Sequence, residues 1–127
     1  MKILLDTHPF IWFIEGNPKL GANARKVIEN PENERWLSVA SIWEVAIKTG
    51  LGKLELSRPF AELENIIHDN DINILPILFN HTVCLSALEL KHRDPFDRLI
   101  IAQGISEGLK IVSKDRHFAA YDVSLIW

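Results

Sequence analysis

Short apolar runs alternate along this chain with longer stretches in which apolar and polar residues recur at helical spacing. The apolar runs are bounded by polar or turn residues, and they predict strands at Lys2–Leu5, Arg35–Val39, Ile72–Leu75, Lys110–Ser113 and Val123–Ile126. The stretches between them predict helices from Thr7 to about Gly16, over Gly21–Glu29, Ser41–Thr49, Pro59–Asp69 and Thr82–Leu90, from Asp94 to Gly108, and from Asp115 to about Ala120. Strands with interleaved helices are typical of an α/β domain built on a mostly parallel sheet.

Residues at the ends of the predicted helices support these boundaries. Thr7 is predicted to cap the first helix, and Gly16-Asn17-Pro18 is a strong stop signal after it. Ser41 and Glu44 have the spacing of a capping box at the start of the third helix. Asp94-Pro95 combines a capping aspartate with a proline at the first helical position, so it marks the start of the helix that ends at glycine.

Composition then narrows the class of protein. The chain has 127 residues, 47% hydrophobic and 24% charged, which suits one folded domain over residues 1–127. Its net charge of −3 argues against a protein that binds nucleic acid through bulk positive charge. Cys84 is the only cysteine, which excludes an internal disulfide and fits a reducing cytoplasm. The longest apolar run, Phe10–Ile14, is too short to cross a membrane, and Asp6 interrupts the N-terminal apolar run too early for a signal peptide.

Four acidic residues fall where an open parallel sheet places its ligands, beyond the carboxyl ends of strands or at the start of the following helix. They are Asp6, Glu44, Asp97 and Asp115. Singly, each has a structural explanation, because the three aspartates lie at helix starts and Glu44 both completes the capping box and precedes Lys48 by four residues. Together, converging carboxylates repel one another unless they take up protons or bind a hard cation such as Mg²⁺ or Mn²⁺.

Other common sites have weaker support in the sequence. The five histidines include no pair at i, i+4 spacing of the kind that binds zinc, and His8 and His92 are expected to be solvated surface side chains. No glycine-rich nucleotide-binding loop occurs. Neither Ser41 nor Ser113 has the surroundings of a serine nucleophile, and Cys84 is expected in the core.

Four segments together resemble the PIN domain, and in particular the VapC-type toxins of bacterial toxin–antitoxin pairs. They are ILLDTH near the N-terminus, SIWEVAIKTGLGKL in the middle, and HRDPFDRLIIAQ and IVSKD near the C-terminus. The segments follow the order found in that family, and the resemblance covers essentially the whole chain. It implies a five-stranded parallel sheet between helices and a Mg²⁺- or Mn²⁺-dependent endoribonuclease, in which the cation activates a water molecule.

The resemblance also implies roles for particular residues. It assigns the acidic, cation-binding set to Asp6, Glu44, Asp97 and Asp115. Ser113 falls where the family has a Thr or Ser near the water or the phosphate. Asp94 is interpreted as the helix cap and Asp97 as the third acid, because Asp97 stands directly before the apolar helix stretch. Among the basic residues that flank the motifs, Arg98 is the one expected to hold a substrate phosphate.

The resemblance implies three partners: an RNA substrate, a small VapB-like antitoxin and a second copy of the chain in a homodimer. The aromatic side chains of the first helix cannot all face inward, which predicts an apolar antitoxin-docking groove carrying Phe10, Trp12, Phe13 and Ile14. An antitoxin arginine is expected to reach the acidic residues and displace the cation. Trp36 and Trp43 are expected in the core.

Other function classes are weighed against this interpretation. The main alternative is a catalytically inactive PIN scaffold that binds RNA or a protein partner, which the presence of all four acids disfavours. A phosphatase of the haloacid dehalogenase kind needs a second aspartate two residues after the first, where this chain has His8. A receiver-type signalling domain needs adjacent acids after the first strand, whereas Thr7 follows Asp6. A test for cleavage that depends on divalent cations therefore separates the enzyme from the scaffold.

Overall fold

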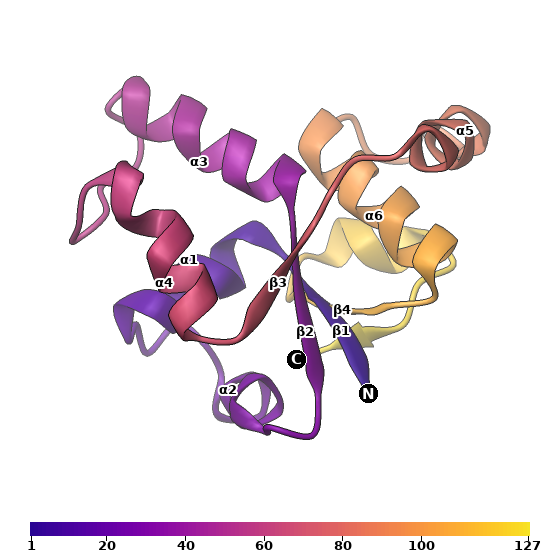
Figure 1. The fold of residues 1–127 in the computed structure, drawn as a ribbon. Helices are drawn as coiled ribbons and strands as arrows, with labels where there is room; N and C mark the ends of the chain where they lie inside the picture. The colour runs from indigo at the N-terminus through magenta and orange to yellow at the C-terminus, as the bar shows by residue number, and fades with distance from the viewer.

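The computed structural model describes all 127 residues and has a five-stranded sheet at its centre (Figure 1). Its strands are β1 (Lys2–Leu5), β2 (Glu34–Ser38), β3 (Ile72–Leu75), β4 (Lys110–Val112) and β5 (Leu125–Ile126). The strand order is β3-β2-β1-β4-β5, and every neighbouring pair is parallel. The predicted α/β architecture with a parallel sheet is therefore confirmed, and the last strand is shorter than the apolar pattern suggested.

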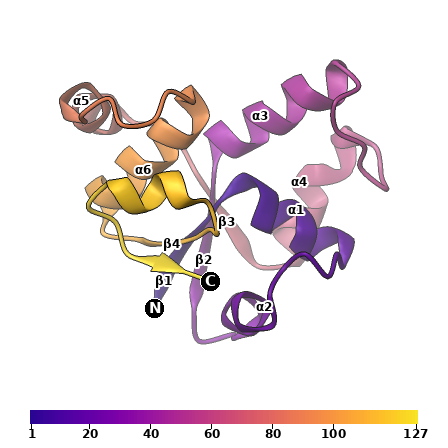
Figure 2. The same ribbon diagram turned by 180° about the vertical axis from the view of Figure 1, so that it is seen from behind.

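Helices cover both faces of this sheet. They are α1 (Thr7–Glu15), α2 (Ala22–Glu29), α3 (Val39–Gly50), α4 (Leu63–Asp69), α5 (Phe79–Ala87) and α6 (Pro95–Glu107), with 3₁₀ segments η1 (Phe60–Glu62) and η2 (Arg116–Ala120). Helices α1, α2 and α4 lie on one side of the sheet, whereas α5, α6 and η2 lie on the other (Figures 1 and 2). Helix α3 follows β2 directly and contacts both α1 and α6. None of the helices is long and apolar enough to span a membrane.

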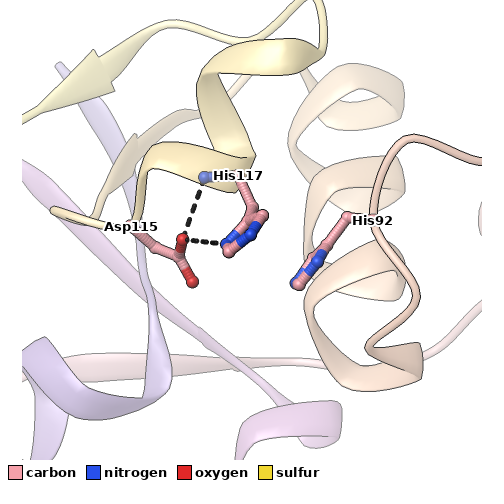
Figure 3. Close-up of side chains that lie close together, drawn as sticks. All are labelled: His92, Asp115 and His117. Carbon is pink, nitrogen blue, oxygen red and sulfur yellow. Dashed lines mark hydrogen bonds and ion pairs between the residues drawn. The ribbon is translucent and has the colours of Figure 1, made fainter.

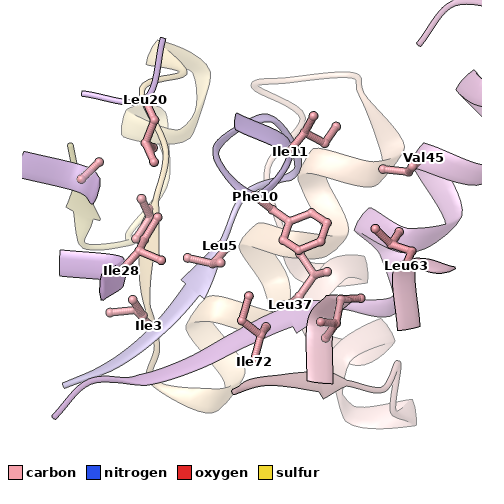
Figure 4. Close-up of a cluster of buried hydrophobic side chains, with 13 residues drawn as sticks. Ile3, Leu5, Phe10, Ile11, Leu20, Ile28, Leu37, Val45, Leu63 and Ile72 are labelled. Atoms are coloured by element: carbon pink, nitrogen blue, oxygen red, sulfur yellow. The ribbon is translucent and has the colours of Figure 1, made fainter. Parts of the chain in front are cut away.

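Alternating side chains of β1 divide the core into two layers. Ile3 and Leu5 point into the layer under α1, α2 and α4, whereas Leu4 points into the layer under α6, and all three are fully buried. Figure 4 shows the first layer, in which the ring of Phe10 lies among the strand side chains near Leu37. Because β1 is covered on both faces, its apolar residues are consecutive and do not alternate with polar ones.

The starts of two helices differ from the sequence interpretation. Helix α1 is capped by Asp6, whose Oδ1 accepts a hydrogen bond of 2.8 Å from the Thr7 N–H, so Thr7 is not the cap. Helix α3 is capped by Ser38, the last residue of β2. The predicted capping box of Ser41 and Glu44 is therefore wrong, and the Ser41 hydroxyl instead accepts a 2.9 Å hydrogen bond from the Thr7 hydroxyl. Helix α1 begins at Thr7 as predicted, whereas α3 begins earlier than predicted because β2 leads directly into it.

The remaining helix ends largely follow the sequence signals. Asp94 caps α6 and Pro95 is its first residue, as predicted. Gly16 and Gly108 end α1 and α6 with φ angles of 63° and 66°, a left-handed conformation that glycine adopts without steric cost. The predicted helix over Pro59–Asp69 starts with the 3₁₀ turn η1 before α4, and α5 both starts and ends earlier than expected.

The structure corrects the placement of several aromatic side chains. Phe10 is buried in the core, so it cannot contribute to an exposed groove, and the side chains of Trp12–Ile14 are half-buried against the same core layer. Trp43, which was expected in the core, is 54% exposed and packs edge-on against Phe96, with ring centroids 5.0 Å apart. The exposed aromatic surface predicted on α1 is therefore not found, whereas Trp43 on α3 is exposed.

Two other side chains expected in the core are only half-buried. Trp36 lies on β2, and its indole N–H donates a 2.9 Å hydrogen bond to Glu34. Cys84 lies on α5, outside both core layers. Both expectations failed because a helical or strand pattern shows which side chains share a face, but not how completely the neighbouring element covers that face.

Candidate active site

The strand order places a crevice at the carboxyl ends of β1 and β4. From β1 the chain adds β2 and β3 on one side of the sheet and then β4 and β5 on the other. Ligands of open α/β sheets bind at such a switch in direction. Asp6 directly follows β1 and Ser113 directly follows β4, and the Ser113 hydroxyl donates a 2.8 Å hydrogen bond to Asp6 Oδ2 between them. Both side chains are buried, so Asp6 is fixed at the crevice by its cap of α1 and by Ser113.

The ionised form of the Asp6 carboxylate is destabilised in this position. Burial raises the pKa of Asp6, and the neighbouring Glu44 carboxylate raises it further. The hydrogen bonds from Ser113 and Thr7 and the charge of His8 oppose the rise without cancelling it. The ionised form of Asp6 therefore gains stability from any cation that reaches the crevice.

Glu44 lies in the second turn of α3 with its side chain buried. Lys48, one turn later, donates from Nζ to Glu44 Oε2 at 2.6 Å, which confirms the predicted i, i+4 pair. The other oxygen, Oε1, is buried and has no hydrogen-bond partner. The hydrogen bond to Glu44 raises the pKa of Lys48 against the effect of burial, and the charges of Asp94 and Asp97 add to the rise. The acidic residues around Lys48 thus stabilise a positive charge at this place in the pocket.

Asp97 lies in the first turn of α6, and its side chain is only 16% exposed. Burial raises the pKa of Asp97 to about 7, a hydrogen bond to His92 lowers it, and the charges of Asp6, Asp94 and Glu44 raise it. Asp97 Oδ2 lies 2.8 Å from His92 Nε2. Asp94 Oδ1 accepts a 2.9 Å hydrogen bond from the Asp97 N–H, which leaves the Asp97 carboxylate free to face the other acids.

Asp115 caps η2, and its pKa is shifted in the direction opposite to those of Asp6 and Asp97. Its Oδ1 accepts a 2.9 Å hydrogen bond from the His117 N–H and lies 2.8 Å from His117 Nδ1 (Figure 3). Burial alone would raise the pKa of Asp115, but these two hydrogen bonds and the charges of His117 and His92 hold it below its ordinary value. Asp115 therefore carries its negative charge over most of the pH range.

All four predicted acids line one open pocket of about 420 Å³. The lining residues are Asp6, His8, Pro9, Trp12, Glu44, Lys48, Asp94, Asp97, Lys114 and Asp115. Ser113 is not among them, because its hydroxyl is buried against Asp6. Arg98 is not among them either. Its guanidinium donates to the carbonyl oxygens of Glu89 and His92 and to the Tyr121 hydroxyl, so it holds the loop before α6 in place.

Sequence reasoning missed part of this pocket. His92 was expected on the solvated surface, but it is half-buried and contacts Asp97. Lys114 Nζ lies over the rings of Trp12 and Trp127, 5.2 Å and 5.8 Å from their centroids. The position of Lys114 between Ser113 and Asp115 was a usable signal, whereas nothing local indicated that the C-terminal Trp127 packs beside α1.

The residues of the pocket fit a hard divalent cation. Asp6, Glu44, Asp97 and Asp115 offer only oxygen ligands, which Mg²⁺ and Mn²⁺ prefer. Glu44 Oε1 is a buried acceptor without a donor. Burial raises the pKa of Asp6 and Asp97, the hydrogen bond to Glu44 raises the pKa of Lys48, and neighbouring negative charges add to all three shifts. A cation bound among these groups would satisfy the acceptor and relieve the repulsion.

Comparisons with known proteins show the family and agree with the observed fold. The model of the PIN domain family matches residues 3–124. The chain is 29% identical to Ribonuclease VapC22 of Mycobacterium tuberculosis over 126 residues, covering 94% of this chain and 91% of that protein. The solved structure of VapBC2 from Rickettsia felis bound to a DNA fragment from the promoter has a TM-score of 0.71 at 18% identity, over 99% of this chain and 98% of that one. VapBC-1 from nontypeable Haemophilus influenzae has a TM-score of 0.71 at 20% identity, over 99% and 97%.

Proposed function

Because this chain belongs to the PIN domain family, we propose that it is a Mg²⁺- or Mn²⁺-dependent endoribonuclease that acts as the toxin of a toxin–antitoxin pair. The observation that carries the proposal is the convergence of Asp6, Glu44, Asp97 and Asp115 on one pocket at the switch point of the sheet. The similarity to Ribonuclease VapC22 supports an RNA substrate. The proposed location is the cytoplasm, where the single cysteine, Cys84, suits reducing conditions.

Each acid has a distinct role in this proposal. Asp6 and Asp97 hold the divalent cation, and Glu44 and Asp115 complete its surroundings directly or through water. Ser113 orients Asp6 through their hydrogen bond, so it positions a ligand and does not itself bind substrate. When bound, the cation supplies polarisation of the scissile phosphodiester and activation of the attacking water.

The basic and aromatic side chains of the pocket suit an RNA strand. Lys48 and Lys114 lie on the pocket wall, where their ammonium groups can neutralise phosphate oxygens. Trp12 lies on the same wall and offers an aromatic face of the kind on which unpaired bases stack. Arg98, the expected phosphate ligand, is committed to the loop before α6, so we assign phosphate binding to Lys48 and Lys114 instead.

The decisive test compares RNA cleavage by the purified chain with and without a divalent cation. We expect cleavage with Mg²⁺ or Mn²⁺ and none after EDTA. Asp6→Asn should reduce the rate by about 100-fold or more, since several kcal/mol of charge stabilisation depend on the ion. Asparagine can still cap α1, so the variant should remain folded. Asp122→Asn, an exposed aspartate outside the pocket, is the matched control. Cleavage that persists in EDTA would exclude the proposed mechanism.

A small VapB-like antitoxin is the proposed protein partner. VapBC2 and VapBC-1 are the structural neighbours that share this fold. The half-buried side chains of Trp12–Ile14 keep part of the predicted docking surface on α1, and the negative field of the pocket suits an antitoxin arginine. Co-expression with the product of the adjacent small gene should relieve growth arrest and yield a complex. If neither occurs while cleavage is retained, the toxin role fails and the nuclease role stands.

A further inference from the structure

A pair of histidines lies at the edge of the acidic pocket, and the proposed RNA chemistry leaves the pair without a role. His92 comes from the loop before α6 and His117 from η2. Their rings stack with centroids 4.4 Å apart and planes 11° apart (Figure 3). The histidine spacing gave no zinc pattern in the sequence, because α6 and β4 separate the two residues along the chain. Only the fold brings the two imidazoles together.

Each of these imidazoles is held by a carboxylate through one nitrogen. His92 Nε2 lies 2.8 Å from Asp97 Oδ2, and His117 Nδ1 lies 2.8 Å from Asp115 Oδ1. Asp97 at one nitrogen of His92 is the arrangement that orients metal-binding histidines, since the other nitrogen is then available as a ligand. Asp115 instead contacts His117 as a second potential ligand, and the exposed His117 ring must turn for both to reach one ion. His92, His117 and Asp115 also form the one set of three potential ligand side chains whose ligand atoms all lie within 4.8 Å of one another.

We propose that His92, His117 and Asp115 form a binding site for a transition-metal cation, with Zn²⁺ as the best match. Imidazole nitrogens favour Zn²⁺, whereas Mg²⁺ takes oxygen ligands, so the site differs in chemistry from the acidic pocket beside it. Two nitrogens and one carboxylate supply three ligands, and water completes a tetrahedral arrangement. The site is therefore of the open type, with one position facing solvent.

Small side-chain movements complete the geometry. Tetrahedral Zn²⁺ places its ligand atoms about 3.3 Å apart, so atoms now within 4.8 Å of one another close by at most about 1.5 Å. The rings must also tilt out of their stack, because the ligating electron pair of an imidazole lies in the plane of the ring. His117 can make this movement, since its side chain is 62% exposed. His92 is more enclosed and provides the fixed side of the site.

Occupation of this site bears on the acidic pocket, because Asp115 lines both. A Zn²⁺ ion that binds Asp115 withdraws one carboxylate from the Mg²⁺ or Mn²⁺ site. Zn²⁺ should therefore inhibit RNA cleavage. This consequence rests on the proposed ribonuclease function, whereas the binding of Zn²⁺ to the histidine pair does not.

The binding test uses calorimetric titration of Zn²⁺ into the full chain carrying no affinity tag, in the presence of excess Mg²⁺ and without RNA. We expect one saturable Zn²⁺ site. His117→Gln and His92→Gln should each lower the affinity for Zn²⁺ by about tenfold or more. Removal of a group that only supports a metal ligand already lowers metal affinity by about this factor. His68→Gln, which changes an exposed histidine on α4, is the matched control and should bind as the unmodified chain does. Because His117 is exposed, His117→Gln tests the site without disturbing the fold.

Absence of saturable Zn²⁺ binding, or equal affinity in the unmodified chain and both histidine variants, overturns the proposal. In the second case the ion occupies the acidic pocket alone. A parallel assay measures RNA cleavage with Mg²⁺ at rising Zn²⁺ and compares the inhibition of each variant with its own Zn²⁺-free rate. The unmodified chain and His68→Gln should be inhibited at lower Zn²⁺ than His117→Gln. If no variant cleaves RNA, the proposed function fails, and the calorimetric result still decides the zinc site.

Discussion

Asp97 is a side chain of the pocket whose pKa its surroundings move close to neutral pH. Burial and the neighbouring carboxylates together raise the pKa of Asp97 to about 7, against the hydrogen bond to His92 that lowers it. Its folded-state pKa therefore lies above its unfolded value, so the folded chain binds the extra proton between about pH 4 and pH 7. The ionised carboxylate consequently costs stability, and that cost appears as the pH rises through this range.

Because the raised pKa makes the ionised Asp97 carboxylate destabilising, the effect of Asp97→Asn on stability should depend on pH. In the absence of divalent cations, the variant should gain stability relative to the unmodified chain, and the gain should be larger at pH 8 than at pH 5 because only the ionised carboxylate is repelled. Urea unfolding of both proteins at the two pH values measures the difference. Addition of Mg²⁺ at pH 8 should stabilise the unmodified chain more than the variant. An equal gain at both pH values would show that Asp97 titrates normally.

The N-terminus of α6 carries a capping acid and one of the acids proposed to bind the cation. Both Asp94 and Asp97 line the pocket, but only Asp94 caps the helix, by accepting a hydrogen bond from the Asp97 N–H. Asp94→Ala should therefore lower the free energy of unfolding by about 1 kcal/mol, the usual value of such a cap. Asp94→Asn should keep most of that stability and most of the cleavage, while Asp97→Asn should lose cleavage. Inactive Asp94→Asn with active Asp97→Asn would reverse the assignment of the third acid.

A buried polar network joins β2, α5 and α6 in the opposite core layer. Gln103 Oε1 accepts a hydrogen bond from the Ser38 hydroxyl, and Gln103 Nε2 donates to the Pro76 carbonyl at 3.2 Å and contacts His81 Nδ1 at 3.3 Å. The side chains of Gln103, Ser38 and His81 are fully buried. The network therefore fixes the approach of α6 to the strand end that leads into Glu44.

Removal of this network should destabilise the fold. Gln103→Leu leaves the buried Ser38 hydroxyl without an acceptor for its proton and removes the side-chain donor to the Pro76 carbonyl, and we expect a loss of about 1–3 kcal/mol in the free energy of unfolding. Asn80→Ala is the control, since it removes an exposed hydrogen bond to Ser106 between the same two helices and should cost less than about 0.5 kcal/mol. Chemical unfolding measured by circular dichroism gives both values. Similar losses in the two variants would contradict the argument.

The exposed apolar surface of the protein bears on its assembly. Phe79 is 84% exposed, and Val83, one turn later on α5, is also exposed, as is Trp43 on α3. Apolar side chains gathered on one face favour association. The homodimer predicted from the family resemblance remains a prediction, and these helices supply surface for it that the first helix does not.

Light scattering at tens of micromolar protein should therefore give the mass of a dimer. Phe79→Ser combined with Val83→Ser should shift the protein toward the monomer, because both side chains are exposed and neither belongs to the core layers. Far-ultraviolet circular dichroism should be unchanged in this variant. A monomer in the unmodified chain would contradict the predicted homodimer.

The sequence pattern was sufficient for the elements and for the acids that follow them. Strand and helix positions depend on residues close along the chain, so the apolar runs and the Asp94-Pro95 start identified them correctly. The cap of α1 was misplaced by one residue because Asp6 and Thr7 are both good capping types. The same local reasoning brought Asp6, Glu44, Asp97 and Asp115 to one end of the sheet.

Contacts between distant segments were decided by the tertiary structure. Arg98 flanks the acidic motif, but the loop carbonyls and Tyr121 hydroxyl that surround it consume its donors. Trp43 was expected in the core, yet it packs edge-on against Phe96 of α6 and more than half of it stays exposed. His92 and His117 carry no mutual signal in the chain, and they stack because η2 follows β4 at the same edge where the loop before α6 begins. Helices and strands form from residues that are close along the chain. Contacts between distant residues, such as His92 and His117, depend instead on how the segments between them pack on the sheet.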